Sequence, residues 1–271
     1  MLGERTLVMG ILNATPDSFS DGGRLPTSEA AIARGLELFE CGADWVDVGG
    51  ESTRPGAVRV DAEEEVRRVV PVVEGLRRRG AGTISVDTTK AAVARKALDS
   101  GADLVNDVSA FSLDPAMAPL VAERGVPAVL MHSRGGFEDR HRDPSYGDVA
   151  LEVVAELAEA LARAEKAGVA REQLIVDPGL GFAKAASHSL EALARLGSLA
   201  SLDRPVLVGP SRKSFIGRLL DRPVDERLMG TAAAVAASVL LGAHVVRVHD
   251  VAEMADVVRV SDAIAAAGAP C

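Results

Sequence analysis

The chain has 271 residues, 48% of them hydrophobic, which is enough to bury the core of one large α/β domain. Its formal net charge of -9 argues against a nucleic-acid-binding protein, because such proteins carry clustered positive charge that neutralises phosphates. Aromatic residues make up only 3% of the chain, so stacking surfaces for single strands are also scarce.

The start of the chain and its cysteines indicate a reduced, cytoplasmic protein. Charged residues interrupt the apolar start, so it lacks the continuous apolar core of a signal peptide. The longest apolar run, residues 232–243, contains Ser238 and is too short to cross a bilayer. Cys41 and Cys271 have neither metal-ligand spacing nor the pattern of a disulfide framework. We therefore expect no insertion into a membrane.

Eight short runs of β-branched and other apolar residues recur along the chain. They cover residues 6–12, 44–48, 83–86, 103–105, 127–131, 173–176, 205–208 and 244–248. A segment with apolar residues at helical spacing follows each run. Alternating strands and helices are typical of a parallel sheet, and eight units are the number of a TIM barrel. We predict an α/β fold with one (β/α)8 barrel domain over residues 1–271.

An open, doubly wound parallel sheet is the alternative fold. Such sheets carry a Gly-rich turn after the first strand when they bind dinucleotides. Here that turn reads Asn13-Ala-Thr-Pro-Asp, which favours the barrel. Several predicted helices end at a Gly-Ala pair, at Gly42, Gly101 and Gly242, where glycine adopts a left-handed conformation before the next strand.

The longest irregular stretches follow strands rather than helices. They are residues 15–27, 51–60 and 133–147. In a barrel these loops lie on the face that carries the active site, so their length points to function. We expect Glu51 to organise the second of these loops rather than to bind substrate.

A polar residue stands at the end of each predicted strand. In chain order these residues are Asn13, Asp47, Asp87, Asn106, His132, Asp177, Ser211 and His249. A single polar residue there can simply cap the next helix, but eight of eight indicate hydrogen-bonding groups around one pocket. His132 is left out of the site, because a lone histidine after a strand is equally well explained as a structural group.

The acidic and cationic residues divide this pocket into two halves. The middle strands supply Asp87, Asn106 and Asp177, which suit the in-plane N–H donors of a flat heterocycle. The last two strands supply cations, Arg212 with Lys213 and Arg247 with His249. Arg54, Arg247 and His249 suit an anion, because guanidinium groups match phosphate oxygens. The alternative for Arg212 and Lys213 is that they are only solvated surface charges. Residues 211–214 also open a helix, whose N–H groups predict a second anion site.

The motifs at these strand ends resemble those of the dihydropteroate synthase family. They are MGILNATPDSFSDGG, DVGGESTRPGA, SVDT, NDVS, LMH, DPGLGFAK, GPSRKSFIG and RVHDV, in the family's order over nearly the whole chain. The resemblance implies a transferase of folate biosynthesis that joins 6-hydroxymethyl-7,8-dihydropterin diphosphate to p-aminobenzoate and releases pyrophosphate. It also implies Mg2+ as cofactor and a homodimer. The chain departs from the family's common pattern at Ala183, where glycine is frequent, and at Pro210.

The resemblance also implies roles for individual residues. The pterin would be bound by Asp87, Asn106, Met131, Asp177 and Lys213. The diphosphate would be bound by Asn13, Arg247 and His249, with Asp47 close by on the pterin side and Asn13 as the magnesium ligand. The p-aminobenzoate would be bound by Phe19, Thr53, Pro55, Phe182 and Ser214. The residues assigned to catalysis are Asp21, Arg54 and Lys213.

The chemistry of this reaction predicts ionisation before attack. Pyrophosphate leaves readily once its charge is neutralised, and the dihydropterin delocalises positive charge at the departing methylene. A preformed cation lowers the demand on a base, because the arylamine is a weak nucleophile. We hypothesise that Asp21 stabilises this cation or accepts the amine proton, since it lies in a Gly-flanked SDGG loop.

Two other functions are compatible with part of the pattern. A pterin-binding methyltransferase would share the barrel and the Asp-Asn-Asp pterin face, but it has no need of the SRKS and RVHD anion sites. A non-catalytic homologue would show eroded first and second loops, whereas SFSDGG and ESTRPGA are intact.

Overall fold

A computed structural model describes residues 3–15, 28–52, 59–135 and 145–268 of the chain. It contains one sheet of eight parallel strands in the order β6-β5-β4-β3-β2-β1-β8-β7. Their bounds are β1 Leu7–Asn13, β2 Trp45–Gly49, β3 Thr83–Asp87, β4 Leu104–Asp107, β5 Ala128–Met131, β6 Leu174–Asp177, β7 Leu207–Val208 and β8 Val245–Val248. A parallel bridge between Val176 and Val206 joins the two ends of this sheet. The predicted barrel is therefore confirmed.

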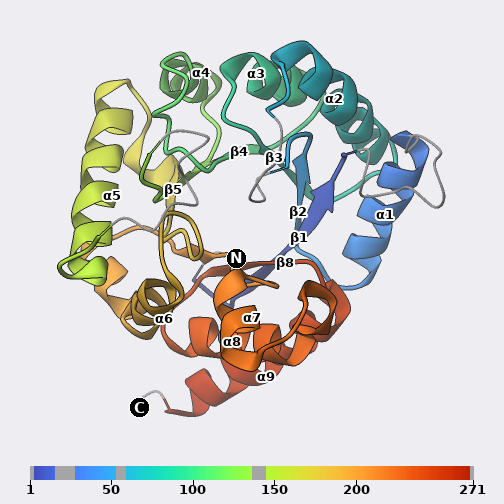
Figure 1. The fold of residues 1–271 in the computed structure, drawn as a ribbon. Coiled ribbons are helices and arrows are strands. Elements are labelled where there is room, and N and C mark those ends of the chain that lie inside the picture. The colour runs from blue at the N-terminus through green and yellow to red at the C-terminus, as the bar shows by residue number, and fades with distance from the viewer. Residues whose placement is uncertain (1–2, 16–27, 53–58, 136–144, 269–271) are drawn as a thin grey trace.

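Helices surround the strands on the outside (Figure 1). Their bounds are α1 Ser28–Glu40, α2 Ala62–Arg78, α3 Ala91–Asp99, α4 Met117–Arg124, α5 Val149–Lys166, α6 Ala186–Ala194, α7 Ser214–Leu220, α8 Leu228–Leu240 and α9 Val251–Gly268. The described residues also include three 3-10 turns: η2 Arg171–Gln173, η3 Leu196–Leu202 and η4 Val224–Glu226. Because both α7 and α8 lie between β7 and β8, α7 is an extra helix after the seventh strand. Among the described helices, none has the length and apolar character to cross a membrane.

Local sequence explains where the helices begin and end. Asp61 caps α2 by accepting a hydrogen bond from the Glu64 amide at 2.8 Å, and Asp148 caps α5 by accepting one from the Leu151 amide at 2.9 Å. Gly101 follows α3 with a φ of 108°, a backbone conformation that side chains with a Cβ rarely adopt. The chain then enters β4 after two more residues, as the glycine pattern predicts.

The two-residue period of the strands separates an apolar layer from a polar layer inside the barrel. The interior cluster takes side chains from six strands: Leu7, Met9, Leu104, Val129, Ile175, Leu207 and Val245, with Trp45 of β2 packed against them. Side chains two positions further along a strand face the same way, nearer its carboxyl end. Asp47 therefore lies above Trp45, and Arg247 lies above Val245. A second, larger cluster packs the outer faces of the strands against the helices.

Candidate active site at the mouth of the barrel

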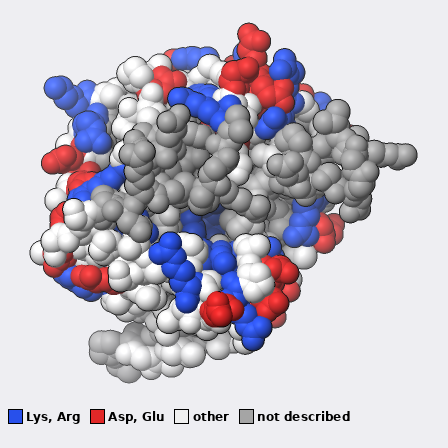
Figure 2. All heavy atoms as spheres, in the orientation of Figure 1, with Lys and Arg blue, Asp and Glu red and all other residues white. Residues whose placement is uncertain are grey.

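An ion-paired network occupies the polar layer of the barrel. Arg247 on β8 donates from Nε to Oδ2 of Asp47 at 2.6 Å and from Nη2 to Oδ2 of Asp87 at 2.7 Å. Nδ2 of Asn106 donates to the same Asp47 oxygen at 2.8 Å. The network thus joins β2, β3, β4 and β8, and it brings together four of the predicted site residues. Figure 2, in the orientation of Figure 1, shows Lys and Arg side chains gathered near the centre of this face.

Burial and neighbouring charges set the pKa values of Asp87 and Arg247 in this network. Burial raises the pKa of Asp87 to about 7, and the negative charge of Asp47 adds to that effect, while Arg247 opposes it. The pKa of Arg247 is raised by Asp47 and Asp87 against the effect of its burial, so the guanidinium stays charged. Arg247 was predicted to bind phosphate oxygens. Its Nε and Nη2 donate to the two carboxylates on the pterin side, so an anion would meet the rest of the guanidinium, and its role toward phosphate stays a prediction.

Two buried oxygens beside the network have no hydrogen-bond partner among the described residues. They are Oδ1 of Asp47 and Oγ of Ser85. The two residues are paired in register on β2 and β3, and both side chains are fully buried. A buried acceptor without a partner is costly, so a donor group that reached Oδ1 of Asp47 would stabilise the site.

Asp177 at the end of β6 lies near Lys213, the residue that directly precedes α7. Burial raises the pKa of Asp177 to about 6, although its Oδ1 accepts a hydrogen bond from the Gly179 amide at 2.7 Å. Burial also lowers the pKa of Lys213 to about 8, against the attraction of Asp177. Lys213 Nζ lies 4.1 Å from the ring centroid of Phe182, so the cation stacks on that aromatic face.

The remaining described candidates lie around the same opening. Met131, 4% exposed, ends β5 and pairs in register with Asp177. Asn13 is half-buried, ends β1 and pairs in register with Gly49. His249 follows β8, and its Nδ1 lies 2.9 Å from Oγ of Ser211. Ser214 is the first residue of α7 and is exposed.

Arg212 was predicted to contribute a cation to the opening, but its guanidinium is paired with Asp250. Its Nε donates to Oδ2 of Asp250 at 3.0 Å, and its Nη2 pairs with the other oxygen of that carboxylate. Its backbone has a φ of 57°, and its amide donates to Oγ1 of Thr231 at 3.0 Å. This turn directs Arg212 to Asp250, so of these two neighbouring cations only Lys213 faces the barrel.

Five predicted site residues lie outside the described residues: Phe19, Asp21, Thr53, Arg54 and Pro55. Their roles stay predictions. The described part of the second loop agrees with the role expected of Glu51, because its Oε1 accepts a hydrogen bond from the Val60 amide at 2.6 Å. Its other oxygen pairs with Lys90 at 3.1 Å, and Lys90 also pairs with the buried Glu65 at 2.5 Å.

His132 belongs to a different environment from the other strand-end residues. Its Nε2 lies 3.1 Å from Oε2 of Glu156 on α5, so the ring faces the helical layer rather than the barrel axis. This follows from the strand period, because Met131 before it faces inward. The sequence did not indicate its second partner, Lys184, whose Nζ lies 2.7 Å from Nδ1 of His132. The available signal was a lysine placed directly after the GLGFA turn that follows β6.

A magnesium ion held mainly by the phosphates of a bound molecule would need few protein ligands. Magnesium in proteins commonly keeps several waters and is bound through one or two protein oxygens plus phosphates. Among the described residues no group of three or more His, Cys, Asp or Glu side chains converges on a metal position. The amide oxygen of Asn13 at the opening suits an ion that a diphosphate brings with it.

Comparison with known proteins identifies relatives over nearly the whole chain. The family model "Pterin binding enzyme" matches residues 9–249. The dihydropteroate synthase of Mycobacterium leprae is 50% identical over 268 residues, which cover 96% of this chain and 94% of the relative. The Xanthomonas albilineans dihydropteroate synthase solved with 4-aminobenzoic acid superposes with a TM-score of 0.92 at 47% identity, covering 98% of this chain and 95% of that one. The same enzyme in complex with 7,8-dihydropteroate gives a TM-score of 0.89 at 44% identity, with the same two coverages of 98% and 95%.

Proposed function

The chain belongs to the dihydropteroate synthase family of pterin-binding enzymes, and we propose that it joins 6-hydroxymethyl-7,8-dihydropterin diphosphate to p-aminobenzoate. The products are 7,8-dihydropteroate and pyrophosphate. The observation that carries this proposal is the buried network of Asp47, Asp87, Asn106 and Arg247 at the barrel mouth, with Asp177 and Lys213 beside it. It supplies paired acceptors for a flat nitrogen heterocycle next to cations that suit its leaving group.

The pterin binds through side chains that the strands hold in place. Asp87, Asn106 and Asp177 offer carboxylate and amide groups to the N–H edge of the ring, and Lys213 offers an N–H donor to a ring acceptor. Met131 packs against the face of the ring. Ionised carboxylates are the better acceptors, so binding strengthens as Asp177 and Asp87 lose their protons, with pKa values raised by burial to about 6 and about 7.

The diphosphate lies on the cationic side of the opening. Arg247 and His249 neutralise charge that develops on the leaving pyrophosphate, and this lowers the barrier to breaking the methylene–oxygen bond. Asn13 would hold a magnesium ion, which when bound supplies further positive charge to the diphosphate oxygens. The carbon–oxygen electron pair leaves with the pyrophosphate, and the dihydropterin ring delocalises the positive charge on the methylene.

The p-aminobenzoate then attacks the cation through its amine. Phe182 and Ser214, with Phe19, Thr53 and Pro55 from the loops, orient the ring so that the nitrogen lone pair faces the methylene carbon. The new carbon–nitrogen bond leaves the amine with an extra proton, which Asp21 accepts. Arg54 closes the pocket against water. Loss of pyrophosphate release in Asp21→Ala would support a role in forming the cation, and unchanged turnover in that variant would remove Asp21 from the mechanism.

One assay tests the overall reaction. The purified chain is incubated with the pterin diphosphate, magnesium and p-aminobenzoate, and pyrophosphate and dihydropteroate are measured together. Equal amounts of the two products are expected, and chelating the magnesium is expected to lower the rate by at least about tenfold. Transfer of a methyl group from a folate to a corrinoid protein without pyrophosphate would contradict the proposal and favour the methyltransferase. Absence of either reaction would favour a non-catalytic homologue.

The apolar surface of α8 and α9 supports a homodimer. The two helices pack against each other, and exposed apolar side chains run along both. On α8, Met229 is 77% exposed and Leu240 is 49% exposed, while on α9 Val260 is 61% and Ile264 is 57% exposed. Their helical spacing places each pair on one side of its helix, with exposed Ala233 between the α8 pair. Exposed apolar side chains on two neighbouring helices are typical of a protein contact, so we infer that a second copy covers them.

A further inference from the structure

Lys184 is a buried lysine that the reaction described above does not use. It is 5% exposed and follows the turn between β6 and α6. Its Nζ lies 3.2 Å from the carbonyl oxygen of Gly179, 3.2 Å from that of Phe182 and 2.7 Å from Nδ1 of His132. An ammonium group has three N–H donors, and these three acceptors match them.

The protonation of His132 is fixed by its other neighbour. Hydrogen bonds from His132 and Arg134 lower the pKa of Glu156 to about 2, so this carboxylate is ionised and accepts from Nε2–H of the imidazole. Burial lowers the pKa of His132, which keeps the ring neutral. Its Nδ1 therefore carries a lone pair, and this lone pair faces Nζ of Lys184, whose pKa burial lowers to about 7.

The turn that surrounds Lys184 has a strained backbone. Gly179, Gly181 and Ala183 have φ values of 67°, 77° and 45°. The value at Ala183 is uncommon for a residue with a Cβ and has to be held by its surroundings. Lys184 binds the carbonyls of this turn from the inside, and the Tyr146 hydroxyl binds the carbonyl of Ala183 at 2.8 Å from the outside.

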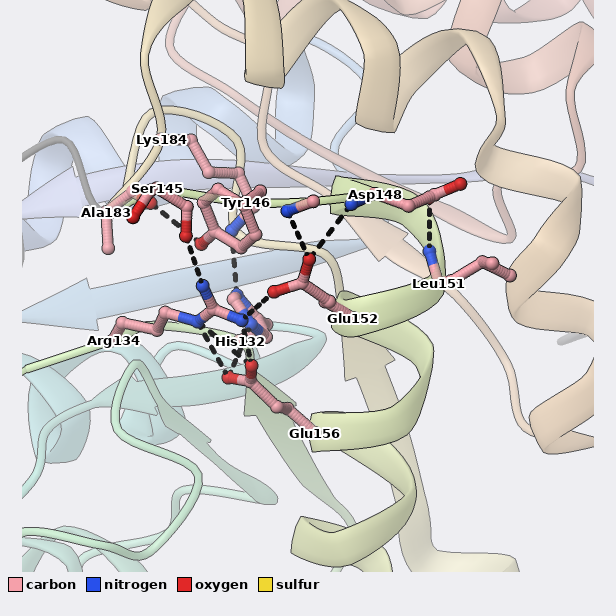
Figure 3. A network of polar contacts seen from close by, with 11 residues as sticks. His132, Arg134, Ser145, Tyr146, Asp148, Leu151, Glu152, Glu156, Ala183 and Lys184 are labelled. Atoms are coloured by element: carbon pink, nitrogen blue, oxygen red, sulfur yellow. Dashed lines mark hydrogen bonds and ion pairs between the residues drawn. The ribbon is translucent and has the colours of Figure 1, made fainter.

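The same network reaches the loop between β5 and α5 (Figure 3). Arg134 donates to Oε1 of Glu156 at 2.9 Å and to the carbonyl of Ser145 at 3.1 Å, and its guanidinium carbon lies 3.9 Å from the ring centroid of Tyr146. A chain of direct contacts therefore runs from Arg134 through Glu156 and His132 to Lys184. It joins the two ends of the β5–α5 loop to the β6–α6 turn.

We propose that Lys184 is a positioning residue for p-aminobenzoate, acting by fixing the β6–α6 turn so that Phe182 stays stacked beneath Lys213. This inference rests on the proposed function. Phe182 is held through its own carbonyl, which accepts from Lys184, whereas Asp87, Asn106 and Asp177 are held by the strands. Losing the Lys184 contacts therefore disturbs the p-aminobenzoate side of the site more than the pterin side.

The first test compares Lys184→Met with Lys166→Met, the same substitution at an exposed position on α5. For Lys184→Met we expect the KM for p-aminobenzoate to rise by at least about tenfold and the KM for the pterin diphosphate to change by less than about threefold. Lys166→Met is expected to match the wild type in both. Equal rises in both KM values, or no rise in either, would overturn the proposal.

A second pair of variants tests the contact of His132 with Lys184 separately from its contact with Glu156. In His132→Asn the side-chain oxygen stands near the position of Nδ1 and keeps an acceptor for Lys184, whereas His132→Leu removes it. The KM for p-aminobenzoate is expected to rise by about threefold or more in His132→Leu and to stay closer to the wild-type value in His132→Asn. If Lys184→Met does not accumulate as a folded protein, this pair decides alone, and equal KM values in the two variants would overturn the proposal.

Amide hydrogen exchange tests the turn without any activity. Residues 178–184 are expected to exchange at least about tenfold faster in Lys184→Met than in the wild type, while β3 keeps its protection. If the wild-type chain made no dihydropteroate, the proposed function would fail and this measurement would still report on the turn. Unchanged exchange in residues 178–184 would overturn the role of Lys184 whatever the activity.

Discussion

Arg247 lets two buried carboxylates stay close together at the centre of the site. It lies between Asp47, which is fully buried, and Asp87, which is 9% exposed. A buried carboxylate without a compensating charge is expensive, and removing one partner of a buried ion pair commonly costs about 3 to 5 kcal/mol. Arg247 therefore has a structural role in addition to its proposed role toward the diphosphate.

Replacing this arginine is expected to destabilise the fold in a pH-dependent way. At pH 8, Arg247→Met should lower the free energy of unfolding by about 3 kcal/mol, because Asp47 and Asp87 then face each other without a cation. The loss should be smaller at pH 5, where Asp87, with its pKa raised by burial to about 7, carries a proton. Urea unfolding at both pH values measures the difference. Adding Asp47→Asn to Arg247→Met should recover part of the loss at pH 8, and a single variant as stable as the wild type there would contradict this role.

Ionisation of Asp177 is a second reason for the stability of the fold to depend on pH. Burial raises its pKa from 3.8 to about 6, so the folded state binds this proton more tightly than the unfolded state does. The resulting stabilisation is complete below about pH 4 and is lost as the pH rises through 6. Asp177→Asn lacks this loss, so its stability relative to the wild type is expected to increase by about 2 to 3 kcal/mol between pH 4 and pH 8.

The control for this pH dependence is a carboxylate far from the site. Asp203 follows η3, its side chain is 90% exposed, and asparagine also tolerates its backbone φ of 52°. Chemical unfolding of Asp203→Asn should stay within about 0.5 kcal/mol of the wild type at both pH values. A constant difference between Asp177→Asn and the wild type across this pH range would show that burial does not shift this proton.

At the level of elements, the β6–α6 turn depends on a glycine. A Cβ on Gly179 would lie 2.0 Å from the carbonyl oxygen of His132. That oxygen cannot easily move, because the His132 amide donates to the Asp177 carbonyl at 2.8 Å. Gly179 also has a φ of 67°, which disfavours a side chain. We expect Gly179→Ala to lower the free energy of unfolding by about 2 to 4 kcal/mol and to raise the KM for p-aminobenzoate.

A glycine elsewhere on the surface provides the matched control. At Gly197, within η3, an added Cβ would meet no atom within 4 Å. Gly197→Ala is therefore expected to leave stability unchanged or to raise it by about 0.5 kcal/mol, because alanine reduces the freedom of the unfolded chain. Urea unfolding and steady-state kinetics of the two variants test the difference. Equal stability of Gly179→Ala and Gly197→Ala would mean that the turn accommodates a methyl group.

The order of elements explains which site residues the sequence could predict. Asp87 and Asp177 end short apolar runs, so the pattern of strands was enough to place them at one opening. The partners of Arg212 and Lys184 could not be predicted in this way. Arg212 reaches Asp250 through a turn with a φ of 57°, and Lys184 contacts His132 across 52 positions of sequence. Such contacts depend on loop backbone geometry and packing, which composition and periodicity do not determine.

At the level of the whole molecule, the number of strands and the class of fold followed from the repeating pattern of runs. The extent of the seventh strand did not, because β7 has only two residues, Leu207–Val208, and meets β6 through one bridge outside the named strands. Pro205 within the predicted run lacks an N–H donor, and its carbonyl instead accepts from the Val176 amide at 3.0 Å. Pro205 therefore explains why β7 begins later than the apolar pattern predicted.

The exposed face of α8 and α9 gives a test at the scale of the assembly. We expect the wild type to sediment at twice the chain mass of 28.1 kDa at micromolar concentration, because burying Met229, Val260 and Ile264 between two copies removes a large apolar surface from water. In Ile264→Glu the buried charge would lack a partner, so the dimer dissociation constant should rise by at least about a hundredfold. Leu151→Glu, at a 58% exposed position on α5, is the control and should remain dimeric. A monomeric wild type, or an Ile264→Glu variant that dimerises as tightly as Leu151→Glu, would show that this face is not the subunit contact.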